Sequence, residues 1–428
     1  MSTSHLTRMR GALARALSID DVNELGRETG QSERLRTITP HRLFLALVAA
    51  LGSAKVQSLA DLQREFNHQN GVRVAYKAFY NRLGHAGFAV FMREMFARLL
   101  KRLTIRTLEA EGESAVARFK DIVIQDGSSF ALKNCLESAF PGRFTNIQPA
   151  AVELHATYSG FSDEVSAVRI AADSEAERQF LPAPKDLRDK LLLADRGYPS
   201  MAYFTAVNEN CGSYVIRLTR STDPWVLNAV LGGRRWPLRK PIRLSTFISQ
   251  HQGRHMDLDV EFERHGVVHR FRVIVVPGRD RWMTRFATNL NRRQFSAALV
   301  TRLYRFRWQI ELCFKEWKSY ANLHRFDTGN PHIAEGLIWA SLCAALLKRF
   351  LAHAAQLVGA VAISTRRVAM CSRHILDDII AAILAGTGLA VVLQRGLDYL
   401  VANARRADHA RERRIGRLRT GLLVVGAS

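Results

Sequence analysis

The sequence has few cysteines, and they are not grouped. Five are scattered along 428 residues. No pair has the Cys-x2-Cys spacing of a zinc site, and an odd, scattered set does not indicate a disulfide framework. We therefore expect reduced, mostly buried thiols in a cytoplasmic protein.

Several sequence signals are also missing. There is no Gly-x4-Gly-Lys phosphate loop and no His-Glu-x2-His motif, which argues against P-loop ATP use and zinc-peptidase chemistry. The most apolar runs, 337–347 and 379–393, are short or bordered by charges, so we expect no membrane span. The first ten residues lack the apolar region of a secretory signal.

Acidic residues are scarce relative to basic ones. The chain has 39 Asp and Glu against 62 Lys and Arg, a formal charge of +23. Hydrophobic residues make up 47% and charged residues 24%, which is typical of a folded globular protein. A balance this basic indicates a polyanionic partner, and without a membrane span we expect that partner to be nucleic acid.

The first 115 residues favour helices. Ser58 and Asp61 predict a capping box that opens a helix over 59–66. After a turn-rich break, 76–83 predicts a second helix with Lys77 and Arg82 on its polar side. This pair is compatible with helix-turn-helix DNA recognition, and equally with two packed helices that bind nothing.

Strand-like patterns begin near residue 115. Apolar runs lead to Asp126 and to Asp195, and each acid is followed by a glycine turn. Further strands are expected at 150–158, 165–171 and 214–218, with helices at 174–181 and 201–208. We expect both acids at the carboxyl ends of their strands, within a few ångströms of each other if those strands are neighbours.

Residues 221–289 interrupt this pattern. A basic, turn-rich segment at 232–243 contains Trp236. It is followed by alternating apolar residues on either side of His265-Gly266, which predict an antiparallel hairpin.

The stretch 293–320 predicts a helix with two adjacent stripes. At about 100° per residue, Tyr304, Arg307, Glu311 and Lys318 fall within about 60° of one another. An apolar stripe beside them predicts a buried face. The alternative is an ordinary amphipathic helix with a solvated charged side.

The chain after Pro331 is expected to stay helical. Residues 333–351 are apolar on most sides and predict a core helix, with further helices over 365–384 and 389–403. The tail 405–419 is rich in arginine, and a solvated tail and a phosphate-binding arm are equally compatible with it.

The spacing Tyr-x2-Arg-x3-Glu-x6-Lys resembles the signature of the IS-four family of DDE transposases of bacterial insertion sequences. Asp126-Gly-Ser-Ser and Asp195-Arg-Gly-Tyr resemble the first two catalytic blocks of that family, with Ser in the first block where many relatives have Thr. The resemblance covers roughly residues 118–325. It implies an α/β fold in which a β-rich insertion domain interrupts a ribonuclease-H-like mixed sheet, with helical N- and C-terminal regions.

These patterns and the resemblance divide the chain into five parts. We expect a helical DNA-binding domain at 1–115, the catalytic domain at 116–220 and 290–355, the insertion at 221–289, and a helical C-terminal region with a basic tail at 356–428.

The acids suit phosphoryl transfer. Three carboxylates on separate elements can hold two Mg²⁺ ions, with Mn²⁺ as a substitute, and without metal they would repel one another. The resemblance implies that Asp126, Asp195 and Glu311 are catalytic metal ligands of a cut-and-paste transposase that nicks DNA and transfers strands through a hairpin. It also implies inverted-repeat and target DNA as partners, a homodimer in the DNA complex, and a bacterial cytoplasmic, nucleoid-associated location.

The candidate DNA-binding residues fall into three groups. Arg307 and Lys318 lie where they can bind phosphates beside the scissile bond, and Tyr304 would hydrogen-bond a terminal phosphate. The family places a tryptophan in its insertion to hold a flipped base, for which Trp282 is the first candidate and Trp236 the second. The other cationic candidates are Lys315, Arg196, Lys77, Arg82, Arg234 and Arg235.

Two other functions remain open. A nuclease or recombinase could use the same site without transposing, and a DNA-binding repressor could bind element ends without cutting them. Intact acids argue against the repressor.

Overall fold

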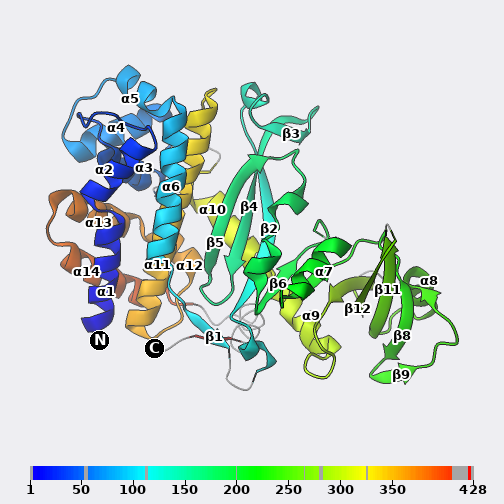
Figure 1. Ribbon diagram of the computed structural model, residues 1–428. Coiled ribbons are helices and arrows are strands. Elements are labelled where there is room, and N and C mark those ends of the chain that lie inside the picture. Colours follow the sequence, from blue (N-terminus) through cyan, green and yellow to red (C-terminus); the bar gives the residue numbers. More distant parts are fainter. Residues whose placement is uncertain are drawn as a thin grey trace.

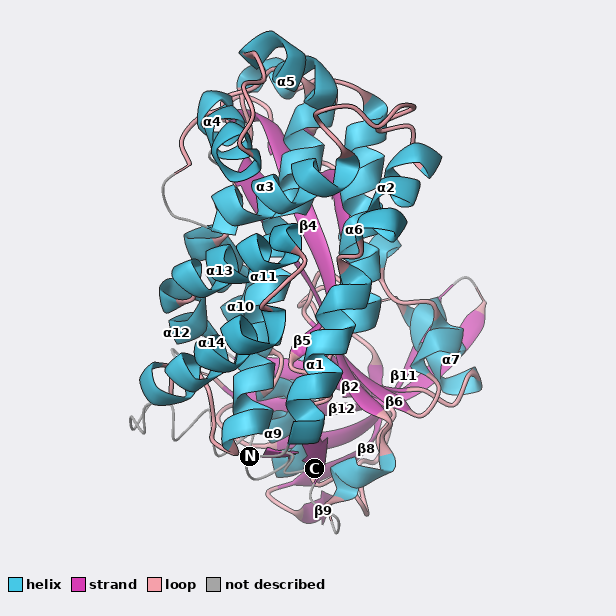
Figure 2. Cartoon of the chain, turned by 90° about the vertical axis from the view of Figure 1, so that its left-hand side faces the viewer, coloured by secondary structure: helices cyan, strands magenta, loops and turns pink. Residues whose placement is uncertain are grey.

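The computed structural model describes residues 3–52, 56–110, 114–198, 200–264, 266–278, 283–323, 326–406 and 423–425. Helices gather on one side of a long sheet, and a β-rich segment lies at the opposite end (Figure 1). Seen from the helical side, α1, α6, α10 and α11 lie in front of the strands (Figure 2). The expected fold class, a mixed α/β sheet with helical ends, is confirmed.

The N-terminal region is helical, as expected. Ser58 and Asp61 form the predicted capping box, and the helix it opens continues to Asn70, where Gly71 ends it with a positive φ of 60°. The next helix has the predicted bounds. The helices of this region are α1 (Thr3–Ala16), α2 (Ile19–Glu28), α3 (Pro40–Gly52), α4 (Leu59–Asn70), α5 (Tyr76–Leu83) and α6 (Ala86–Leu103).

Five strands form the part of the sheet that carries the two aspartates, in the spatial order β5–β4–β2–β6–β7. β2 and β4 are antiparallel, as are β4 and β5, whereas β2, β6 and β7 run parallel. This is the order of a ribonuclease-H-like sheet. The strands are β2 (Asp121–Ala131), β4 (Gln148–Ser159), β5 (Glu164–Ala172), β6 (Lys190–Ala194) and β7 (Ser213–Arg217).

Alternation along these strands gives the sheet two apolar faces. Ile122 and Leu191 belong to a core shared with the helical layer. Their neighbours Val123 and Leu192 belong to a second core with α7 (Met201–Glu209) and the β-rich segment. Burial on both faces explains why the sequence of these strands is continuously apolar.

Two details of this region differ from expectation. Asp126 does not end its strand, because β2 continues to Ala131 through antiparallel pairing with β4. Its pairing with β6, however, stops one residue before Asp126, at Gln125 opposite Ala194. The expected helix at 174–181 is only a 3-10 turn, Glu177–Phe180. Pro182 follows it and favours an extended residue before it.

The β-rich segment extends the same sheet. β13 (Met283–Thr288) pairs with β7, and β12 (Val267–Pro277), β11 (Met256–Arg264) and β8 (Trp225–Leu231) follow outward. β11 and β12 form the predicted hairpin. The smaller elements of the molecule are β1 (Leu108–Ala110), η1 (Ala115–Arg118), η2 (Asn134–Leu136), β3 (Pro141–Phe144), η4 (Pro184–Leu187), β9 (Arg234–Trp236), β10 (Ile242–Arg243), α8 (Leu244–Gln250) and β14 (Leu423–Val425).

The predicted single helix over 293–320 is two helices, α9 (Ala297–Arg305) and α10 (Trp308–Tyr320). Backbone N–H groups of Phe306, Arg307, Gln309 and Ile310 each donate to the carbonyl three residues earlier. The backbone therefore tightens at the junction into the 3-10 pattern, while Phe306 and Arg307 keep right-handed helical dihedrals.

The C-terminal part is helical, as expected. α11 (Pro331–Gly359) is long and apolar enough to cross a membrane, but the most apolar part of it is entirely buried inside the protein. It is the predicted core helix. The expected helix over 365–384 is divided at Ser372 into α12 (Thr365–Cys371) and α13 (Arg373–Ala385), and α14 spans Leu389–Asn403. Most of the basic tail lies outside the described residues.

Candidate active site

Asp126 and Asp195 lie side by side. Their strands are parallel neighbours, and the pair Gln125–Ala194 directly precedes them. Asp195 is the first residue after β6. The sequence therefore predicted their proximity correctly, because apolar runs of matched length deliver both acids to one edge.

Arg307 connects the first aspartate to the glutamate. Its Nη1 lies 2.7 Å from Asp126 Oδ2, and its Nη2 donates to Glu311 Oε1. The arginine side chain is only 13% exposed, and the two carboxylates are 18% and 25% exposed. The break between α9 and α10 places Arg307 before α10 and Glu311 within its first turn.

Asp195 has two partners of its own. The Tyr304 hydroxyl donates to Asp195 Oδ1 over 3.0 Å. Arg217, at the end of β7, places Nη1 3.7 Å from the same oxygen. Arg217 was not among the sequence candidates, although it ends a parallel strand beside β6, where side chains converge.

Lys318 and Lys315 have different surroundings. Lys318 donates from Nζ to the carbonyl of Ser129, on the part of β2 beyond Asp126, over 2.7 Å. Lys315 lies over the ring of Trp308, 4.9 Å from its centroid, and lines a cavity of about 430 Å³ with Glu316. The two lysines, three residues apart on α10, therefore have different contacts.

Burial raises the pKa of Asp126 to about 6, against the opposing charge of Arg307, and Asp195 and Glu311 add to the increase. Burial likewise raises the pKa of the Tyr304 phenol, with a further contribution from Asp195. Both pKa shifts reflect burial first, and neighbouring negative charge second.

Two further acids, Glu153 and Glu177, lie next to the glycines that follow the two aspartates. A side chain at Gly127 would collide with the Glu153 carboxylate, and one at Gly197 would collide with Glu177. The glycine after Asp126, and the one two residues after Asp195, therefore leave room for these acids. Burial raises the pKa of Glu153 to about 7. Arg143 contacts both Glu153 and Glu177.

A sequence signal for this group existed. Glu153 and His155 alternate on β4 and therefore share a face, opposite Ser129 and Gly127. Burial lowers the pKa of His155 to about 4, and its ring stacks on Phe180 at 3.6 Å between centroids. Asp121, the first residue of β2, accepts backbone hydrogen bonds from Ile122 and Phe161.

The remaining candidates have varied surroundings. Lys77 is exposed on α5, whereas Arg82 and Gln31 exchange hydrogen bonds between side chain and backbone. Arg196 is exposed on the turn after Asp195. Arg234, Arg235 and Trp236 form the exposed strand β9 of the insertion, and Trp282 lies outside the described residues.

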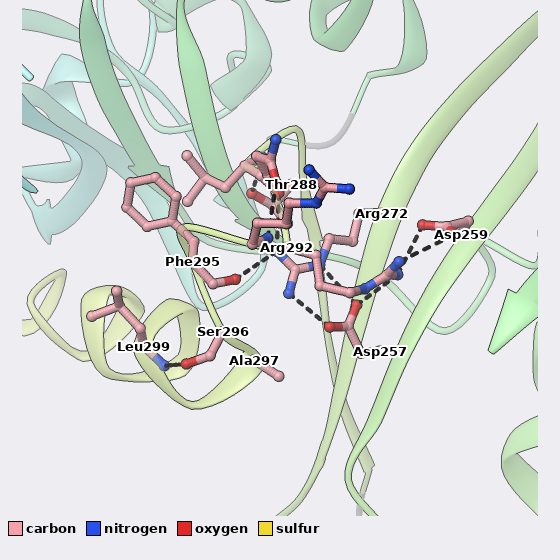
Figure 3. A network of polar contacts seen from close by, with 12 residues as sticks. Asp257, Asp259, Arg272, Thr288, Arg292, Phe295, Ser296, Ala297 and Leu299 are labelled. Carbon is pink, nitrogen blue, oxygen red and sulfur yellow. Dashed lines mark hydrogen bonds and ion pairs between the residues drawn. The ribbon is translucent and has the colours of Figure 1, made fainter. Parts of the chain in front are cut away.

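A network of ion pairs, centred on buried Arg272 and Asp257, connects the β-rich segment to the start of α9 (Figure 3). Arg272 makes two 2.7 Å hydrogen bonds to Asp257 and donates to the carbonyls of Leu290 and Phe295. Arg292 reaches Asp257 and Asp259. Because Phe295 directly precedes the N-cap of α9, this network holds the helix that carries Tyr304.

The three acids of the site offer the kind of ligand atoms that a hard divalent cation prefers. Asp126, Asp195 and Glu311 supply only oxygen donors, and Asp126 and Glu311 already share one cation, the guanidinium of Arg307. Within the described ranges, no three acidic, His or Cys side chains are arranged to hold a metal ion as they stand. The donor set suits such an ion, whereas in the present geometry the guanidinium of Arg307 lies between Asp126 and Glu311.

Comparison with known proteins bears on this site. Residues 117–347 match the family described as the transposase DDE domain. The chain is 17% identical over 357 residues to the transposase of insertion sequence IS1151 from Clostridium perfringens, covering 73% of this chain and 74% of that protein. It is 20% identical over 387 residues to the IS231C transposase of Bacillus thuringiensis subsp. berliner, covering 78% and 77%.

A shorter match of higher identity involves the putative transposase InsL of IS186A from Escherichia coli, 43% identical over 60 residues, or 14% of this chain and 16% of that protein. Among solved structures, a piggyBac transposase synaptic complex with hairpin DNA aligns with a TM-score of 0.46 and 10% identity, over 92% of this chain and 85% of that one.

Proposed function

Since the chain belongs to the DDE transposases of insertion sequences, whose domain its residues 117–347 match, we propose that it moves DNA by a cut-and-paste reaction at Asp126, Asp195 and Glu311. The observation that carries this proposal is the placement of the three acids. Two lie on adjacent parallel strands, and the third is linked to the first through Arg307.

The three carboxylates are the proposed ligands of divalent ions, Mg²⁺ with Mn²⁺ as a substitute. Such ions, when bound, activate the attacking oxygen and stabilise the leaving oxygen of an in-line displacement. In the reaction, water first attacks the phosphodiester at the element's end and releases a 3′-hydroxyl. That hydroxyl then attacks the opposite strand to form a hairpin, and after the hairpin is opened it attacks target DNA.

The other side chains of the site bind and orient the DNA. Arg307 offers a planar fork that can hold two oxygens of one phosphate, and Lys318 offers a point charge at the far end of β2. The Tyr304 hydroxyl, now held by Asp195, can turn to a terminal phosphate. Exposed Arg196 and the β9 arginines extend the basic surface, and Lys77 and Arg82 are the N-terminal candidates.

The proposed partners are the inverted-repeat ends, target DNA and a second copy of the chain. Joining two ends requires two active sites, which is why a homodimer is proposed for the DNA complex. A net charge of +23 favours association with the long polyanion over the whole surface.

A strand-transfer assay tests the proposal. Duplexes that carry the DNA flanking the gene are incubated with the full chain, a target plasmid and Mg²⁺. We expect hairpin-ended intermediates and joined products from the wild-type protein, and bound but uncut DNA from Asp126→Asn. Cleavage without joining would instead identify a nuclease, and binding without cleavage would identify a repressor.

A further inference from the structure

Arg307 occupies the place that the proposed chemistry requires for a metal ion. Its guanidinium bonds to Asp126 on β2 and to Glu311 on α10, so one cation neutralises two of the three acids. The pair is largely shielded from water, with the arginine 13% exposed. A divalent ion cannot bind both carboxylates in the same way until the guanidinium leaves.

We propose that Arg307 closes the Asp126–Glu311 pair in the DNA-free protein, and that a DNA phosphate opens it by taking the guanidinium. Divalent cation and DNA then bind cooperatively at this site. This regulation deepens the proposed function, and it rests on the proposed use of the three acids as metal ligands.

Metal ion and DNA should bind cooperatively because either one alone leaves a charged group of the site unpaired. A metal ion that displaces Arg307 strands a buried guanidinium, which is costly. A phosphate gives the guanidinium a bidentate partner of the same charge as the carboxylate that it leaves. Because each ligand removes a cost of binding the other, the coupling must be reciprocal.

The backbone around Arg307 allows such a movement. Arg307 stands at the junction of α9 and α10, where hydrogen bonds of the 3-10 type separate the two helices. Glu311 lies one turn further, inside α10. A local change at this junction can therefore turn Arg307 without moving Glu311, and 3-10 turns within helices are often hinges.

The arginine also has unused donor capacity. Among the described residues, its Nε–H is buried without a hydrogen-bond partner. A phosphate oxygen can satisfy this donor together with one Nη, whereas the present carboxylate contacts use only the two Nη atoms. Exchanging a carboxylate for a phosphate would therefore satisfy a buried donor that has no acceptor in the present arrangement.

Mn²⁺ binding tests the proposal without requiring catalysis. Free Mn²⁺ is measured by electron paramagnetic resonance in titrations of the DNA-free full chain. We expect weak binding by the wild-type protein and binding about tenfold tighter or more by Arg307→Gln. Arg305→Gln, which removes the same charge from an exposed neighbouring position, should leave the affinity unchanged.

Arg307→Lys separates closure from simple charge repulsion, and serves if Arg307→Gln does not fold. A lysine keeps the positive charge but cannot span both carboxylates. Tighter Mn²⁺ binding by Arg307→Lys supports closure, whereas an affinity equal to that of the wild-type protein overturns it.

DNA supplies the second arm of the test. A duplex carrying the DNA that flanks the gene should tighten Mn²⁺ binding by the wild-type protein and have little effect on Arg307→Gln. Tight Mn²⁺ binding by the DNA-free wild-type protein would overturn the proposal. If cleavage requires the three acids but Arg307→Gln binds Mn²⁺ no more tightly, only the closure is wrong. If the acids are dispensable for cleavage, the proposed function itself fails.

Discussion

The two sides of α10 carry similar ionic groups in different surroundings. On one side, Arg307 links Asp126 and Glu311 at the edge of the sheet. On the other, Arg349 of α11 lies 2.7 Å from Glu316 and 3.5 Å from both Asp163 and Glu164. Arg349 is 6% exposed, about half the exposure of Arg307.

The Arg307 group is an ionic site that can exchange partners, whereas the Arg349 group stabilises the fold. The Arg349 group joins the β4–β5 turn, α10 and α11, and Thr365 donates to Glu316 as well. Burial raises the pKa of Glu164 to about 7, against the charge of Arg349. The Arg307 group instead lies where β2 loses its β6 neighbour, beside Asp195. Both groups pair an arginine with carboxylates, and they differ mainly in how accessible those carboxylates are to a ligand.

Substituting one glutamate on each side should give the largest contrast. We expect Glu311→Gln to lower DNA cleavage roughly a thousandfold or more while the protein stays folded, because the proposed site loses one of three ligands. Glu316→Gln should keep wild-type cleavage per folded molecule. Cleavage rates normalised to the folded fraction measure both, and a comparable loss in the two variants would contradict the distinction.

Removing the arginines should affect stability in the opposite order: we expect the Arg349 variant to lose more free energy of unfolding than the Arg307 variant. Arg349→Met leaves three buried acids without their cation, and we expect a loss of about 3–5 kcal/mol in the free energy of unfolding. Arg307→Gln should cost roughly 1–2 kcal/mol, since water reaches its carboxylates more easily. Urea unfolding measures both values. A larger loss at Arg307 would show that the catalytic side, too, is structural.

The pH dependence of stability should single out Asp126. Its pKa is raised from 3.8 to about 6, so the folded state favours the protonated acid. The stabilisation that protonated Asp126 gives the folded state is present in full below the unfolded pKa of 3.8, and it is lost as pH rises through the folded pKa of about 6. Relative to Asp126→Asn, the wild-type protein should lose about 2–3 kcal/mol over that interval. Urea unfolding at several pH values tests this, and parallel pH profiles would contradict it.

The same comparison shows what the sequence could predict. Apolar runs place Asp126 beside Asp195, and the spacing of Arg307 and Glu311 places those two side chains together, because both features depend on local periodicity. Partners depend on strand register and helix ends, which local patterns do not specify. The break before Trp308 and the continuation of β2 to Ala131 were therefore missed.

Long-range partners account for the remaining differences. No apolar run leads through Glu153 into a glycine turn, yet pairing of β4 with β2 brings it against Gly127. Arg217 ends a strand that was recognised, but only the order of the sheet places it beside Asp195. Glu316 pairs with Arg349 of α11, a partner 33 residues away that helical spacing could not identify.

The two lysines of α10 should give the smallest difference, and it bears on how far the catalytic side extends. Lys318 contacts the β2 extension next to Asp126, so Lys318→Met should lower DNA affinity about fivefold and reduce the slope of log affinity against log salt by about 1. Lys315→Met should do less, because that ammonium already lies over Trp308 and lines the same cavity as Glu316. Fluorescence anisotropy with labelled duplex at several salt concentrations measures both slopes. An equal or larger effect at Lys315 would mean that the DNA passes over Trp308. The DNA-binding surface of α10 would then extend beyond the residues near Asp126.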